Sequence, residues 1–182
     1  FNLKGAILQQ TRSNSTPLSI TYYGNATISA LPESNFNMVQ DRYSYFNQII
    51  FAKRFNDNFS MQFAPSLSHF NAVTSNMKND MFAIAFGAKI KVSPGTNILI
   101  DYSQPLTSYD DPTPADIALG GIKTPKPGFS IGAEFNTSAH AFQIFASNYW
   151  GIVPQQNYMY NQNDFWSGDI LIGFNITRLY NF

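Results

Sequence analysis

The chain has 182 residues, no cysteine, and a formal net charge of zero from 11 Lys and Arg against 11 Asp and Glu. This length suits one domain, the balanced charge argues against a nucleic-acid partner, and the lack of cysteine excludes disulfides and thiolate metal sites. Charged residues make up only 12% of the chain, about half the usual share, yet no run of about 18 apolar residues suggests a membrane-spanning helix.

Apolar and polar residues alternate in nine segments, each bounded by residues typical of turns. Because successive side chains of a strand point to opposite faces, this pattern predicts β-strands, with no helix of useful length. The third strand has an ambiguous phase, and Pro65 in the fourth is expected to mark a bulge, because proline cannot donate a ladder hydrogen bond. The predicted strands are residues 1–10, 18–29, 42–55, 59–70, 81–92, 97–103, 129–136, 140–148 and 169–182.

The last strand has the features of the closing strand of a bacterial outer-membrane barrel. Its alternate residues include Phe174, Ile176, Tyr180 and Phe182, interrupted by Arg178, and the segment ends on an aromatic residue. We therefore predict that these four apolar and aromatic residues form a carboxy-terminal insertion signal.

The polar face of the predicted strands consists mainly of Ser, Thr, Asn, Gln, Gly and Ala, while the other face carries Phe, Ile and Leu. A soluble barrel or sandwich also alternates, but its wet face normally carries many Lys and Glu. Small polar residues inside and bulky apolar residues outside fit a transmembrane barrel that faces lipid. The predicted fold is an all-β, antiparallel transmembrane β-barrel.

The predicted connections alternate between long and short, as in outer-membrane barrels with long extracellular loops and short periplasmic turns. With the carboxy-terminus in the periplasm, nine strands place Phe1 at the extracellular end. Single-chain bacterial barrels usually have an even number of strands. The expectation is one barrel domain over residues 1–182 that lacks one or more amino-terminal strands, with roughly ten to fourteen strands in the complete protein.

Several segments resemble a known family. They are residues 45–55 (YFNQIIFAKRF), 59–69 (FSMQFAPSLSH), 140–148 (HAFQIFASN) and 168–178 (GDILIGFNITR). The family is a group of Bacteroidetes-type outer-membrane β-barrel proteins known as a domain of unknown function. The resemblance covers most of the chain and implies a location and a fold. It implies no activity and supplies no catalytic residues.

Sparse charges are expected on the inward face of the barrel. They could form a charged constriction in a pore, or a paired plug that fills the lumen. The predicted lumen charges are Lys89, Lys91, Asp101, Glu134 and Asp169.

Aromatic residues near strand ends predict girdles at the lipid interface. The predicted interface residues are Tyr102, Trp150, Trp166 and Tyr180. In the loop before the last strand, Tyr158 and Tyr160 could instead stack on a sugar or a partner protein.

The two histidines, His69 and His140, could belong to a hydrolase triad, but no nucleophile-elbow motif accompanies them. Asp110, Asp111 and Asp116 lack the spacing of a calcium loop. We therefore expect no catalytic residue, metal or cofactor.

The expected function is a non-enzymatic outer-membrane barrel that serves as a structural or accessory subunit of a cell-envelope assembly. A narrow diffusion pore for small solutes is the alternative, and an outer-membrane hydrolase is a weaker one. The expected partners are outer-membrane lipid, other envelope proteins and, during insertion, the barrel-assembly machinery, with no nucleic acid.

Overall fold

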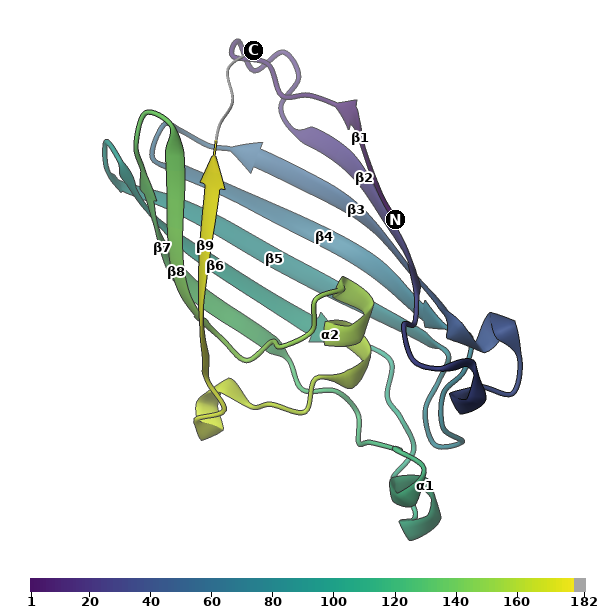
Figure 1. The fold of residues 1–182 in the computed structure, drawn as a ribbon. Coiled ribbons are helices and arrows are strands. Elements are labelled where there is room, and N and C mark those ends of the chain that lie inside the picture. Colours follow the sequence, from purple (N-terminus) through teal and green to yellow (C-terminus); the bar gives the residue numbers. More distant parts are fainter. Residues whose placement is uncertain (179–182) are drawn as a thin grey trace.

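The computed structural model describes residues 1–178 and contains one sheet of nine antiparallel strands that pair in chain order (Figure 1). This arrangement confirms the predicted all-β, antiparallel fold. The strands are β1 (Asn2–Leu8), β2 (Ser19–Ile28), β3 (Tyr43–Arg54), β4 (Phe59–Phe70), β5 (Asp80–Ser93), β6 (Thr96–Pro105), β7 (Gly128–Asn136), β8 (His140–Ser147) and β9 (Leu171–Arg178).

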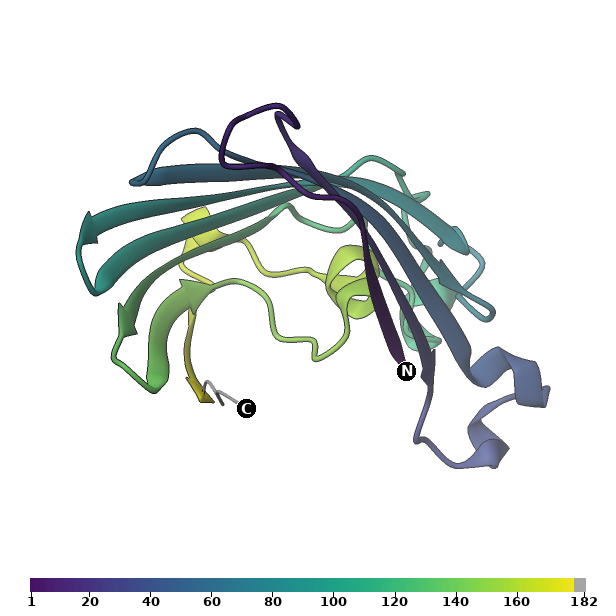
Figure 2. The same ribbon diagram turned by 90° about the horizontal axis from the view of Figure 1, so that it is seen from above.

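The sheet curls strongly, so that it has a concave and a convex face (Figure 2). β1 and β9 are its two edges, and within residues 1–178 they do not pair with each other. Two short helices, α1 (Pro114–Ala118) and α2 (Pro154–Tyr160), and the 3-10 turns η1 (Glu33–Asn35), η2 (Val39–Arg42) and η3 (Phe165–Ser167) lie in the connections. None of the helices in the described part of the chain is long and apolar enough to cross a membrane.

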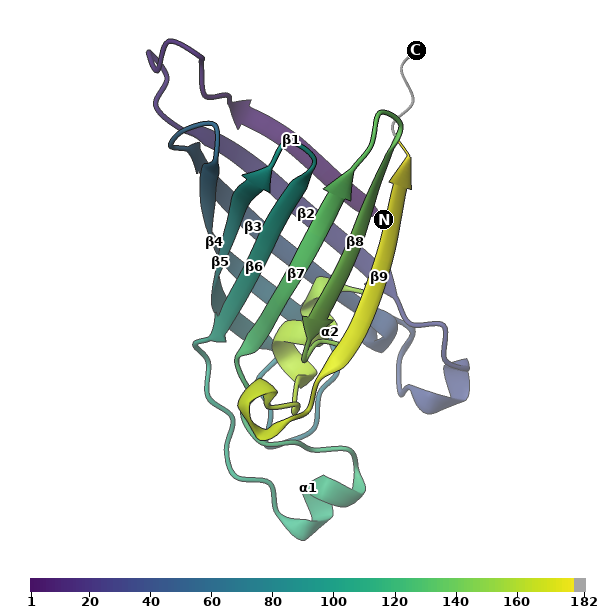
Figure 3. The ribbon, with the colours of Figure 1, turned by 90° about the vertical axis from the view of Figure 1, so that its left-hand side faces the viewer.

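Successive connections lie at opposite ends of the sheet, and those at one end are longer, except that residues 9–18 at the other end are about as long as residues 71–79 (Figure 3). We call the two ends the loop end and the turn end. The loop end carries residues 29–42, 71–79, 106–127 and 148–170, and the turn end carries residues 9–18, 55–58, 94–95 and 137–139.

The strand pairing settles the phase of β3. Phe46 is 1% exposed and lies opposite Asn25 of β2 and Ser68 of β4, which are also buried. These residues face the concave side, where α2 contacts the sheet. The even-numbered residues of β3 therefore face inward, although two of them, Phe46 and Ile50, are large and apolar.

The predicted bulge at Pro65 is wrong. The β3–β4 pairing keeps one register on both sides of Pro65, from Gln48 opposite Ser66 to Phe51 opposite Phe63, and merely lacks the pairs between them. The missing proline donor interrupts that ladder locally, while on its other side Pro65 remains paired with β5. Register shifts occur instead at residues 6–8 of β1 and 91–93 of β5.

The convex face is apolar and uncovered. An aromatic row crosses five neighbouring strands of this face, each residue directly opposite the next. Phe51, Phe63 and Phe86 in this row are each more than a third exposed. The row consists of Phe51, Phe63, Phe86, Tyr102 and Phe129. Large apolar side chains that no protein covers suit contact with lipid.

The main buried apolar cluster lies at the loop end, inside the curl of the sheet. It joins Met77, Met81, Tyr109 and Met159, which come from β5 and from three different loops. Parts of three loops are therefore packed against the sheet at this end.

Candidate functional site

The connection 148–170, which we call the loop plug, folds back against the concave face and places α2 across β3 to β6 (Figures 1 and 2). Gln155 on α2 has no exposed surface, and its Nε2 donates hydrogen bonds to Asn25 Oδ1 at 2.8 Å and Ser44 Oγ at 3.1 Å. Its Oε1 has no partner among the described residues. A buried amide that bonds to two strands fixes the position of α2 on the barrel wall.

Apolar and aromatic contacts hold the same helix. The ring of Tyr158 stacks on Phe46 with centroids 5.4 Å apart, and that of Tyr160 packs edge-on against Phe70 at 5.2 Å. Met159 is completely buried. Tyr158 and Tyr160 thus face the barrel wall and are not displayed for a sugar or a partner protein.

The base of the loop plug is held by amide groups. Asn148 Nδ2 donates to the carbonyl oxygens of Pro127 at 2.9 Å and Asn163 at 2.8 Å. The Tyr149 hydroxyl is bonded to Ser103, and its ring lies over Gly128, where a Cβ atom would come within 1.9 Å of that hydroxyl. Glycine at this position is therefore required for Tyr149 to reach the strand wall.

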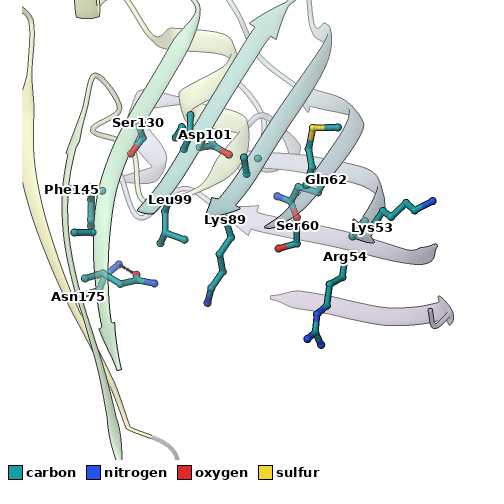
Figure 4. A pocket seen from close by; sticks show the side chains of 18 of the residues that line it. Lys53, Arg54, Ser60, Gln62, Lys89, Leu99, Asp101, Ser130, Phe145 and Asn175 are labelled. Carbon is teal, nitrogen blue, oxygen red and sulfur yellow. Dashed lines mark hydrogen bonds between the residues drawn. The ribbon is translucent and has the colours of Figure 1, made fainter. Parts of the chain in front are cut away.

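Between α2 and the turn end, the concave face lines an open cavity of about 580 Å³ (Figure 4). Leu99 and Phe145 give it apolar walls, and its polar lining includes Gln62, Asp101 and Ser130. Phe145 fits there because β9 has Gly173 opposite it, where a Cβ atom would lie 2.3 Å from the ring. The cavity has the size and mixed lining of a small-molecule site.

Two of the predicted lumen charges form an ion pair. Lys89 Nζ lies 2.6 Å from Glu134 Oε1, and the carboxylate also accepts hydrogen bonds from three amide groups. These amides belong to Asn97, Asn136 and Gln143. Glu134 is thus a fully satisfied acid that ties β5, β6, β7 and β8 together.

The other predicted lumen charges have different positions. Lys91 is on the same face of β5 as Lys89, but it is exposed near the turn end. Asp101 lines the cavity, and its carboxylate makes no hydrogen bond or ion pair within residues 1–178. Asp169 lies before β9, where its carboxylate accepts a hydrogen bond from the Asp164 backbone at 3.0 Å, so it is an exposed residue of the loop end and not a wall charge.

Three of the four predicted interface aromatics lie within the described residues, in or beside the connections of the loop end. Tyr102 belongs to the aromatic row, and Trp166 is 81% exposed beside Phe129, with ring centroids 5.5 Å apart. Trp150 is 58% exposed in the loop plug. Tyr180 lies outside the described residues.

Of the predicted insertion signal, Phe174 and Ile176 are on the convex face of β9 and are 58% and 56% exposed. Phe182 and Tyr180 fall outside the part of the chain that the structure describes.

The histidines do not meet a serine nucleophile among residues 1–178. His69 Nδ1 is 2.7 Å from Asp80 Oδ1, but its Nε2 contacts Asn71 Oδ1 at 3.0 Å. His140 packs against Phe142. No group of three or more His, Asp or Glu that could hold a metal ion is found in this same range. Asp110, one of the acids considered for calcium, instead forms an ion pair in which its Oδ2 lies 3.1 Å from Lys78 Nζ.

Sequence reasoning missed the loop plug and the aromatic row. A weak signal for α2 exists: Pro154 suits the first turn of a helix, and Gln155 and Met159 have the four-residue spacing of one helical face. The aromatic row left no such signal, because its members come from five strands and meet only through the register.

A curled antiparallel meander with an uncovered apolar convex face and small polar residues inside defines a transmembrane β-barrel wall. Residues 1–180 match the family described as Membrane bound beta barrel domain (DUF5777), and the chain belongs to this family. No curated protein and no solved structure matches the chain. The family assignment establishes a membrane-bound β-barrel domain of unknown function.

Proposed function

We propose that this protein is a bacterial outer-membrane barrel, of Bacteroidetes type, that acts without catalysis as a structural or accessory subunit of a cell-envelope assembly. The observation that carries the proposal is the loop plug. With α2 bonded to β2 and β3 through Gln155 and stacked on Phe46 through Tyr158, the loop end of the lumen is filled by the protein's own chain. A filled lumen leaves the loops as the working surface.

The loop end offers such a surface. α1 projects beyond the sheet, and Ile117 and Leu119 near its end are 60% and 76% exposed (Figure 3). Ser75 and Thr113 bond to Asp116 and hold this segment in place. Exposed apolar side chains on an ordered projection fit contact with another envelope protein.

Conductance of the full-length protein in a planar lipid bilayer tests the filled lumen. We expect a silent bilayer, with folding verified by heat-modifiable gel mobility. A variant in which residues 150–166 are replaced by a short linker should conduct, which shows that the assay detects an open barrel. Discrete conductance steps from the native protein that change in Lys89→Glu would instead establish a diffusion pore. This is the alternative function, and the cavity beside Lys89 favours it.

A photocrosslinking side chain tests the accessory role. A photocrosslinking residue introduced at position 119 in cells should form a discrete adduct with another envelope protein. The same residue introduced at position 130, inside the cavity, should form none. The absence of adducts at Leu119 would contradict the accessory role. The His69–Asp80 pair gives a hydrolase little support, because the ring nitrogen that would activate a serine contacts Asn71.

A further inference from the structure

We propose that the cavity on the concave face is a binding site for a small organic cation, with Asp101 as the residue that binds its ammonium group. The two acids of this part of the wall differ sharply. Glu134 accepts four hydrogen bonds, including the one from Lys89. The carboxylate of Asp101, one strand away, accepts none from any described residue, although Asp101 lies on the cavity wall.

Three cationic residues, Lys53, Arg54 and Lys89, also line the cavity, and each is engaged by another residue. Lys89 is paired with Glu134, and Arg54 with Asp57 in the turn that follows β3. Lys53 lies over the ring of Phe55, with its Nζ 5.4 Å from the centroid, and points away from the cavity (Figure 4). No cation within residues 1–178 therefore forms an ion pair with the Asp101 carboxylate. A carboxylate in such surroundings favours a cationic partner.

The remaining lining indicates the kind of cation. Leu99 and Phe145 offer apolar surface, while Gln62 and Ser130 offer neutral hydrogen-bonding groups (Figure 4). A bare metal ion would need several oxygen ligands, whereas one carboxylate suffices for an ammonium group. The cavity volume of about 580 Å³ is within the range of ligand sites and admits an apolar body attached to that group.

The loop plug lies on the loop-end side of the cavity, where α2 packs on β3 to β6. The lining extends from Asp101 to Arg54 and Ser60 beside the turn 55–58. A ligand can therefore reach Asp101 from the turn end without displacing the loop plug. This inference does not depend on whether the protein has a partner at its loops.

The test is isothermal titration calorimetry of the full-length protein in lipid nanodiscs. The ligand is benzylamine, and the neutral benzyl alcohol and the anionic benzoate serve as comparisons. Benzylamine should bind saturably and more tightly than either comparison. Asp101→Asn should weaken benzylamine binding by about ten- to hundredfold, the loss expected for a charged hydrogen bond, and Asp101→Glu should restore part of it.

Asp111→Asn is the matched control, because it makes the same charge change in an exposed loop and should leave the affinity unaltered. Leu99→Trp should also abolish binding, because it fills the cavity without touching the charge. Failure of the native protein to bind benzylamine saturably, equal binding of benzyl alcohol, or unaltered binding by a folded Asp101→Asn variant would each overturn the proposal.

Discussion

Truncation of Met159 is expected to release the loop plug while leaving the barrel wall intact. Its side chain has no exposed surface and packs with Met77, Met81 and Tyr109, which lie in separate segments. The Tyr109 hydroxyl also donates a hydrogen bond to the Met159 carbonyl oxygen at 3.2 Å, and this backbone contact does not require the methionine side chain. A buried methionine replaced by alanine costs about 2–5 kcal/mol, and the flexible side chain places this case toward the lower end.

A loss of about 2 kcal/mol corresponds to a roughly 30-fold larger open population of α2. This population can be measured by hydrogen–deuterium exchange mass spectrometry of the protein in nanodiscs, from the exchange rates of peptides that cover residues 154–160. We expect these amides to exchange roughly 30-fold faster in Met159→Ala, while amides of β3 to β6 keep their protection.

Ile152→Ala is the control, because Ile152 is 99% exposed in the same loop and should leave the exchange rates unchanged. Rates in Met159→Ala within about threefold of the native protein would show that Met159 does not hold α2 on the wall. Equal loss of protection in the strands would show that the loop plug and the wall open together. Either result would refute the reasoning.

Three further predictions concern the wall and the loops. Ile131→Arg places a charge on the convex face, where Ile131 is 42% exposed, and should prevent assembly into the folded, heat-modifiable form because arginine in mid-bilayer costs about 2–4 kcal/mol. Ser130→Arg, which points into the cavity, should assemble, and equal behaviour of the two variants would contradict the assignment of faces. Glu134→Leu should lower the stability by about 2–3 kcal/mol, because three amides lose their acceptor while the half-exposed Lys89 regains water. An unchanged urea midpoint would contradict this role. Hydrogen bonds from Ser75 and Thr113 hold the pKa of Asp116 below its usual value. The ionised Asp116 carboxylate therefore stabilises loop 106–127 at any pH above its unfolded-state pKa of about 4. This stabilisation is lost as the pH falls through the lowered pKa of the folded state. Protection factors of the loop amides in an acid titration should show this loss, and Asp116→Asn should remove it; identical titrations would contradict it.

Much of the wall could be predicted because the evidence for it is local. Each strand carries its own alternation, and turn residues such as Asn56 and Asp57 mark where strands end. β3 was the exception, since Phe46 and Ile50 face inward as large apolar residues. Phe46 is needed there because Tyr158 stacks on it, and that contact involves residues more than a hundred positions apart in the chain.

The candidate site was harder to predict than the wall. The alternation of polar and apolar residues along each strand was enough to predict that Lys89, Asp101 and Glu134 face inward. Which of them pair depends on the register between β5, β6 and β7, and the sequence does not specify that register. Asp169 was placed on the wall because the alternation of the closing strand appeared to begin there, whereas β9 begins at Leu171.

The sequence by itself determined the class of this protein. Each strand of a membrane barrel must place apolar side chains in lipid and form its backbone hydrogen bonds with a neighbouring strand. These two requirements explain the strand periodicity, the sparse charge and the alternating connection lengths. The tertiary structure alone decided what lies inside. The position of α2, the pairing of Glu134 with Lys89 and the unpaired Asp101 arise from contacts between distant segments, and such contacts leave no periodic trace in the chain.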